Sequence, residues 1–227
     1  MACVRRFGKP HLFITFTTNP NWEEITASLG PRETHADRPD ICVRVFYQKF
    51  LELKHEIQMK NIFGKVVCFL ATIEFQKRGL PHAHILLTLS SEDGPNTPER
   101  VDRVVCAEIP DPIINPILYG IVNKHNIHGP CGAVNKNSPC MVGEGNERHC
   151  SKSYPKKLKE TTTLDMHNYP EYRRRIGAVF EHRSGFLDNT WVVPYNPILT
   201  LRYNCHINVE VVHSTKCVKY LYKVIPY

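Results

Sequence analysis

The chain has 227 residues, of which 42% are hydrophobic and 10% aromatic, and its formal net charge is +7. This composition is that of an ordinary globular protein, long enough to bury one sizeable core. No run of residues is long and apolar enough to cross a membrane, and the N-terminus has no apolar signal segment, so we expect a soluble, intracellular protein with no membrane partner. The positive charge favours a polyanionic partner, although many basic proteins bind no nucleic acid.

The first elements can be predicted from local pattern. Residues 11–17 form an apolar, β-branched run that ends at Asn19-Pro20-Asn21, which predicts a strand followed by a turn. Asn21 is placed to cap a short helix that begins at Trp22. Apolar residues then recur at helical spacing and predict a long amphipathic helix from near Asp40, with this buried face: Val43, Phe46, Phe50, Leu53 and Ile57.

Two further strands are predicted on either side of a short connection. Residues 65–75 are an apolar run, and a second run follows the turn at Gly79-Leu80-Pro81. His82 and His84 project from the same face of the second strand because side chains alternate along a strand. Glu74, near the end of the first strand, faces them, so the three side chains can form a three-ligand site for a divalent metal. The competing interpretation is that a His-x-His pair in a strand is structural or lies on the surface.

The remaining elements are less regular. Residues 90–96 predict a loop, and Thr97-Pro98 predicts the start of a helix. From about residue 111 to 190, prolines interrupt the pattern and predict an insertion with little regular structure apart from a short helix over 117–124. Regular structure is expected again from Trp191, with a strand over 198–210. A last helix is expected from near Ser214, with Cys217, Val218, Leu221 and Val224 on its apolar face.

Seven of the nine cysteines fall into two groups. Four lie in apolar periodic segments and are interpreted as reduced core residues: Cys42, Cys68, Cys106 and Cys217. Cys131, Cys140 and Cys150 lie instead in a polar, Gly-rich region, and with His128 they fit a tetrahedral structural zinc site. The irregular spacing leaves His149 or His125 as alternative ligands, and reduced loop cysteines as the alternative to a metal site.

The predicted last helix carries a candidate nucleophile, Tyr220. A tyrosine phenolate can attack a phosphodiester and stay bonded to the 5′ phosphate, and Lys219 and Lys223, within one turn, can supply positive charge. The alternative is a tyrosine at the boundary of the core. Two basic runs, Lys152 to Lys159 and Arg173 to Arg175, either follow a DNA backbone or form a solvated basic face.

Several motifs in order resemble the Rep endonuclease part of Helitron transposon proteins, the helitron helicase-like domain, in the HUH endonuclease superfamily. The motifs that carry the resemblance, besides the run from Glu74 to His84, are Arg5 to Pro10, Phe13 to Trp22, His128 to Cys131, Ser138 to Met141, Tyr172 to Arg175, Val192 to Asn196, His206 to Glu210 and Lys219 to Lys223. The resemblance implies an α+β fold with a central antiparallel sheet, flanking helices, the metal hairpin at its centre and the Tyr220 helix beside it.

The resemblance also implies a function. Glu74, His82 and His84 would hold Mg²⁺ or Mn²⁺, and Tyr220, assisted by Lys223, would nick and transfer single-stranded DNA through a phosphotyrosine intermediate, as in rolling-circle transposition. A nuclear location in a eukaryotic host is expected. The competing function is that of a non-catalytic, DNA-binding remnant of a transposon protein.

The chain departs from the family pattern at two points. The family usually carries a second tyrosine four residues after the first, where this chain has Val224. The sequence also lacks a Gly-x4-Gly-Lys-Ser/Thr phosphate-binding loop, so no ATPase activity is expected, and a helicase would be a separate domain or protein. We therefore expect a single domain over residues 1–227, with a Cys/Pro-rich insertion at about 111–190.

Overall fold

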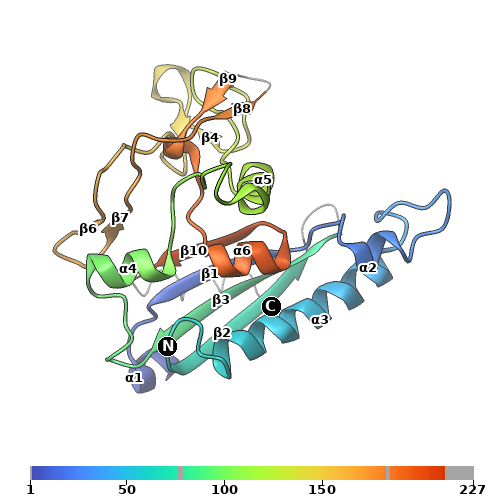
Figure 1. Ribbon diagram of the computed structural model, residues 1–227, viewed down its shortest axis with the longest axis horizontal. Coiled ribbons are helices and arrows are strands. Elements are labelled where there is room, and N and C mark those ends of the chain that lie inside the picture. The colour runs from blue at the N-terminus through green and yellow to red at the C-terminus, as the bar shows by residue number, and fades with distance from the viewer. Residues whose placement is uncertain (1, 76–78, 183–184, 213–227) are drawn as a thin grey trace.

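A four-stranded antiparallel sheet forms the centre of the molecule (Figure 1). The computed structural model describes residues 2–75, 79–182 and 185–212. The strands are β1 (Leu12–Thr17), β2 (Val66–Phe75), β3 (Pro81–Leu89) and β10 (Ile207–Val211), in the spatial order β10-β1-β3-β2. This arrangement, with helices beside the sheet, confirms the predicted α+β class. The predicted position of the metal hairpin at the centre of the sheet is only partly correct: within the described part of the chain, β3 is an interior strand but β2 is an edge strand, so the hairpin occupies one side of the sheet.

The two faces of the sheet have different environments because side chains alternate along β3. Ala83, Ile85, Leu87 and Leu89 belong to the main hydrophobic core, whereas His82, His84 and Leu86 point to the opposite face. The core face is covered by α3 (Pro39–Gln58), together with residues of α4 (Pro98–Val104) and α6 (Pro197–Tyr203) (Figure 1).

The long helix α3 starts as predicted, but its buried face is shifted slightly at the first turn. Phe46, Phe50, Leu53 and Ile57 are buried as expected. Cys42 is fully buried in place of the predicted Val43, which is half-buried. The other predicted helix start, Thr97, is confirmed, because its side chain accepts a hydrogen bond from the backbone N–H of Arg100.

The short helices near the N-terminus are α1 (Ala2–Phe7) and α2 (Glu23–Thr26). The predicted Asn21 cap of α2 is wrong: the capping position is Trp22, and no side chain caps the helix. The side chain that organises this turn is Asn19, whose Oδ1 accepts a hydrogen bond from the Asn21 backbone N–H at 2.9 Å. Trp22 is buried, and its Nε1 donates to the carbonyl oxygen of Tyr203 at 2.6 Å.

The predicted strand over residues 198–210 is only partly correct. Residues 197–203 form helix α6, because the Asn196 side chain accepts from the backbone N–H of Leu199 and Pro197 occupies the first turn. The helix ends at Asn204, which has the left-handed backbone conformation with φ of 43°. The strand β10 begins after this turn, at Ile207.

The insertion contains more structure than predicted (Figure 1). The predicted helix is α5 (Pro116–His125). Short ladders and single 3₁₀ turns follow it, namely β4 (Met141–Val142), η1 (Gly145–Glu147), β5 (His149–Cys150), β6 (Thr163–Leu164), β7 (Pro170–Glu171), β8 (Phe180–His182), β9 (Gly185–Leu187) and η2 (Asn189–Trp191). A second, small core of Ile109, Val122, Val192 and Tyr195 lies under them. No helix in the described ranges is long and apolar enough to span a membrane.

The arginine run, predicted either to follow a DNA backbone or to form a solvated basic face, makes contacts within the protein. Arg174 is buried and donates to the carbonyl oxygens of Asn189 and Val192 at 2.6 and 2.8 Å. Arg175 and Arg173 both pair with the carboxylate of Glu108. All three guanidinium groups thus have contacts within the protein, although Nε of Arg173 has no hydrogen-bond partner among the described residues. These contacts favour a structural role for the arginines.

Candidate metal centres

Glu74, His82 and His84 converge on one point at the β2–β3 hairpin. In the strand register Glu74 lies opposite His82, and Thr72 lies opposite His84. One ligand atom from each of the three side chains lies within 4.8 Å of the other two. The predicted convergence is therefore confirmed as geometry, and it follows from the strand parity and the short connection.

The separations of the three ligand atoms suit a divalent cation. Oε1 of Glu74 lies 2.9 Å from Nε2 of His84 and also contacts Nε2 of His82, and the two Nε2 atoms are 3.1 Å apart. Neighbouring ligands of an octahedral ion with bonds of about 2.1 Å are separated by about 3 Å. Two imidazole nitrogens and a carboxylate oxygen are also a common donor set for divalent transition metals. The residues present therefore fit a metal ion.

The protonation states of the cluster favour metal binding. Burial lowers the pKa of His82, and the nearby charge of His84 lowers it further, so the neutral imidazole is favoured. Burial acts to raise the pKa of Glu74, but the hydrogen bond from His84 and the charges of both imidazoles outweigh it, and the pKa lies below its usual value. A neutral imidazole and an ionised carboxylate are the forms that bind a cation.

Two residues of β1 hold His84 in place. Thr15 Oγ1 lies 3.2 Å from Nδ1 of His84, and the Phe13 ring stacks on the imidazole with 5.5 Å between centroids. A contact to Nδ1 orients the ring so that Nε2 points to the metal position. Our sequence interpretation missed both residues. The period-two alternation in 12–17 places Phe13 and Thr15 on one face and is the signal that identifies them together.

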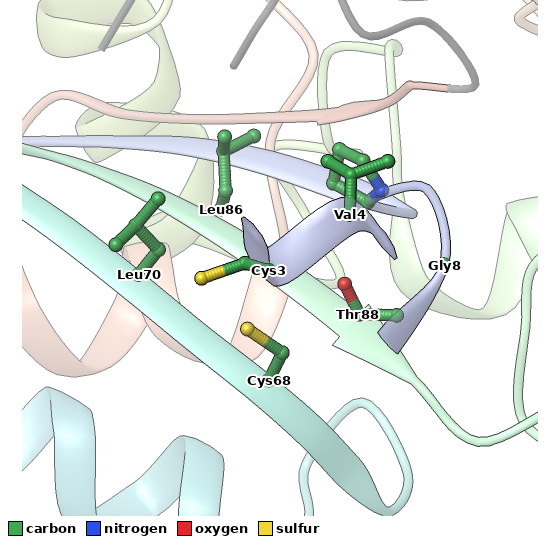
Figure 2. Close-up of a pocket in the computed structure, with 8 residues that line it drawn as sticks. Cys3, Val4, Gly8, Cys68, Leu70, Leu86 and Thr88 are labelled. Carbon is green, nitrogen blue, oxygen red and sulfur yellow. The ribbon is translucent and has the colours of Figure 1, made fainter. Parts of the chain in front are cut away.

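The far end of the same sheet face contains two cysteines. Helix α1 packs there beside β2, and Figure 2 shows Cys3 and Cys68 lining a small cavity with Leu70 and Leu86. Burial raises the pKa of Cys68, and Cys3 raises it further, which favours the protonated thiol. Of the four predicted core cysteines, Cys42 is buried and Cys68 and Cys106 are half-buried, while Cys217 lies outside the described residues.

His128, Cys131, Cys140 and Cys150 form a second cluster. One ligand atom from each of these residues lies within 4.8 Å of the other three. The two predicted alternative ligands are placed elsewhere. His149 is exposed, and its Nδ1 lies 2.8 Å from the carbonyl oxygen of Glu147, while among the described residues His125 is not part of either cluster. The predicted set of four residues is thus brought together by the fold.

The predicted nucleophile cannot be placed. Tyr220, its neighbours Lys219 and Lys223, and the departure from the family pattern at Val224 all lie in 213–227, outside the described residues. Their roles stay predictions from the sequence.

Comparison with known proteins gives one family match, which covers the N-terminal part of the chain. Residues 1–87 match a family model described as the Helitron helicase-like domain at the N-terminus. A search of curated protein sequences returned no match. The matched segment contains Glu74, His82 and His84 and ends before the cluster of His128, so the second centre lies outside the match.

Proposed function

We propose that this chain, a transposon-related protein whose residues 1–87 form a Helitron helicase-like N-terminal domain, nicks single-stranded DNA in a metal-dependent reaction. The observation that carries the proposal is the convergence of Glu74, His82 and His84 on one point within the matched segment. Their ligand atoms lie close enough for one divalent cation, and the side chain of Glu74, 27% exposed, leaves the cluster accessible.

The donor set makes Mn²⁺ or Mg²⁺ the proposed ion. Mg²⁺ prefers oxygen ligands, whereas Mn²⁺ accepts imidazole nitrogen more readily, so a pair of histidines favours Mn²⁺ when both are present. When bound, the ion supplies Lewis-acid polarisation of a phosphate oxygen and neutralises charge that develops on the phosphate. Glu74, His82 and His84 would hold it from one side and leave the opposite side for substrate oxygens.

The proposed nucleophile is Tyr220. Its phenolate oxygen would form a bond to phosphorus while the bond from phosphorus to the 3′ oxygen breaks, and the departing oxygen takes up a proton to become a 3′ hydroxyl. The product is a 5′ phosphate linked to tyrosine, which keeps the phosphoester available for strand transfer. Lys223, one helical turn away in the sequence, would stabilise the phenolate. A helicase would act from a separate domain or protein.

The alternative is a DNA-binding remnant without nicking activity. Val224 stands where the family that the chain resembles usually has a second tyrosine. This favours the alternative over a mechanism that uses two tyrosines one after the other. It does not affect a single nick by Tyr220.

An adduct assay separates the two functions. The chain is incubated with single-stranded DNA labelled at its 3′ end, with Mn²⁺, Mg²⁺ or EDTA, and denaturing electrophoresis reveals DNA bound covalently to protein. We expect an adduct with either metal and none with EDTA. Tyr220→Phe should abolish it, whereas the matched variant Tyr222→Phe should retain it. Loss of the adduct in Tyr222→Phe alone would assign the nucleophile to Tyr222. DNA binding without an adduct under every metal condition would support the remnant.

A further inference from the structure

We propose that His128, Cys131, Cys140 and Cys150 bind one structural Zn²⁺ that holds the insertion together. This site lies outside the segment that matches the Helitron family model, and it is independent of the proposed nicking reaction. The proposal rests on the geometry of the four ligand atoms, on their chemistry and on how little else in the structure stabilises the surrounding segment.

The distances within the cluster are those of a tetrahedral zinc site. Nε2 of His128 lies 3.7 Å from Sγ of Cys131 and 3.5 Å from Sγ of Cys150. Tetrahedral bonds of about 2.3 Å to sulfur and about 2.0 Å to nitrogen give a sulfur-to-nitrogen separation of about 3.5 Å. The three sulfurs and the nitrogen all lie within 4.8 Å of one another, so a single ion can reach all four.

The donor chemistry selects zinc over the ion proposed for the first centre. Three thiolates and one imidazole are a typical structural zinc set, whereas Mg²⁺ and Mn²⁺ prefer oxygen ligands. Neighbouring polar groups contact two of the three sulfurs. The backbone N–H of Lys152 donates to Sγ of Cys150 at 3.4 Å, and the Ser138 hydroxyl lies 3.3 Å from Sγ of Cys140. Such contacts orient metal-bound sulfurs and offset their charge.

The segment around the cluster has little else to stabilise it. Strands β4 and β5 pair over two residues each, and an isolated two-stranded ladder is at best marginally stable. Most residues between 133 and 149 are exposed, including Val134 and Val142, while Cys131 and Cys150 are only 2% and 5% exposed. Burial in this segment is therefore concentrated at the ligands, as expected where a metal replaces a hydrophobic core.

The cluster is joined to the rest of the insertion through His128. Its backbone N–H donates to the carbonyl oxygen of Trp191 at 2.8 Å, and its ring stacks on Tyr154 with 4.1 Å between centroids. Two residues earlier, the buried Asn126 donates from Nδ2 to the carbonyl oxygen of Ile207, at the start of β10. An ion at the cluster would thus fix the loop 129–150 to η2 and, through Asn126, to the edge of the central sheet.

The first test is metal content with matched cysteine variants. Cys140 and Cys68 are both half-buried, but only Cys140 belongs to the cluster, so Cys140→Ser and Cys68→Ser form a matched pair. We expect about one zinc per chain in the unmodified protein and in Cys68→Ser, and at least a tenfold lower content in Cys140→Ser. Limited proteolysis should cut the segment 133–149 faster in Cys140→Ser than in Cys68→Ser. Equal zinc in the two variants would overturn the proposal.

The second test does not depend on whether a variant folds. Co²⁺ exchanged into the unmodified chain should give the thiolate-to-cobalt charge-transfer absorption of a sulfur-rich tetrahedral site, which the sulfur-free cluster of Glu74, His82 and His84 cannot produce. The absorption should persist in His84→Ala. Absence of this absorption, zinc that is lost with His84→Ala but kept in Cys140→Ser, or iron with sulfide in place of zinc would each overturn the assignment. None of these results depends on DNA nicking.

Discussion

At the scale of single residues, His84 has a threonine opposite it on each neighbouring strand. Thr15 on β1 and Thr72 on β2 are its cross-strand partners. Thr15 Oγ1 lies 3.2 Å from Nδ1 of His84. Thr72 Oγ1 is buried and has no hydrogen-bond partner in the part of the chain that the structure describes. The two hydroxyls therefore occupy similar positions but should differ in their effect on the metal centre.

This difference gives a matched pair of variants. Thr15→Val removes the hydroxyl that orients His84, and we expect it to weaken Mn²⁺ binding by about tenfold, the lower end of the effects of residues behind metal ligands. Thr72→Val removes an unsatisfied hydroxyl with little change in shape, so Mn²⁺ affinity should stay within about twofold and stability should be unchanged or higher. Calorimetric titration with Mn²⁺ measures the affinity of each variant, and urea unfolding measures its stability. Equal loss of affinity in the two variants would contradict a positioning role for Thr15.

The residues of the first centre were predictable because they are close in sequence. Glu74 and His84 are joined by a short connection, and strand parity alone places Glu74, His82 and His84 on one face. Thr15 is 69 residues from His84, and its contact depends on β1 pairing with β3, which no local pattern specifies. The cysteine cluster was predictable from ligand chemistry, although spacing alone left His149 and His125 open as ligands.

At the scale of elements, helix α6 shows how a capping signal competes with strand propensity. Residues 198–210 contain enough β-branched and aromatic residues to favour a strand. Asn196-Pro197, a cap followed by a proline in the first turn, starts a helix instead, and the left-handed Asn204 ends it before β10. The long helix α3 had no such competition, because its apolar spacing extends over about four turns and decides the structure.

Asn196 has two separable roles. Its Oδ1 accepts from the backbone N–H of Leu199 at 3.1 Å, and its Nδ2 donates to the buried carbonyl oxygen of Val104 at 2.9 Å. Asn196→Ala removes both bonds and should lower the free energy of unfolding by about 2–3 kcal/mol. Asn196→Ser keeps a capping oxygen and loses only the bond to Val104, so it should cost about 1 kcal/mol less. Urea unfolding of both variants measures the two contributions separately. Equal losses in the free energy of unfolding would show that the cap contributes nothing.

Within the insertion, Arg174 has a structural role comparable to that of Asn196. It is buried and donates to carbonyl oxygens of η2 and its neighbours, whereas Arg175 pairs with Glu108 at the surface. Lysine cannot reproduce the planar fork of arginine, so Arg174→Lys should destabilise the protein by about 3 kcal/mol. Arg175→Lys should cost at most about 1 kcal/mol, because its ion pair is solvated. Thermal unfolding measures the Tm of the two variants. Similar decreases in Tm would argue against a structural role for Arg174.

At the scale of the whole molecule, four histidines are held in environments that disfavour their charge. Burial is the largest cause of a lowered pKa for His82, His125, His128 and His206, and for His125 the pKa falls to about 4, with the charges of Lys124 and His206 contributing. His82 belongs to the first metal centre and His128 to the second, while the His206 ring and the His125 backbone oxygen are hydrogen-bonded to each other. Protonation therefore affects both centres and the junction between the insertion and the sheet.

The consequence is a loss of stability of the metal-free protein as the pH falls from about 6.5. An unfolded histidine titrates near pH 6.5, so between that pH and the lower folded pKa values the unfolded state binds more protons, and acidification favours unfolding. His125 alone should account for about 1 kcal/mol between pH 7.5 and about 5.5. Urea unfolding of the chelated protein should show the decline, and His125→Gln should make it shallower. Mn²⁺ and Zn²⁺ compete with protons for the same nitrogens, so both ions should stabilise the protein more at pH 7.5 than at pH 5.5. A stability that is independent of pH over this range would contradict the buried, neutral state of these histidines.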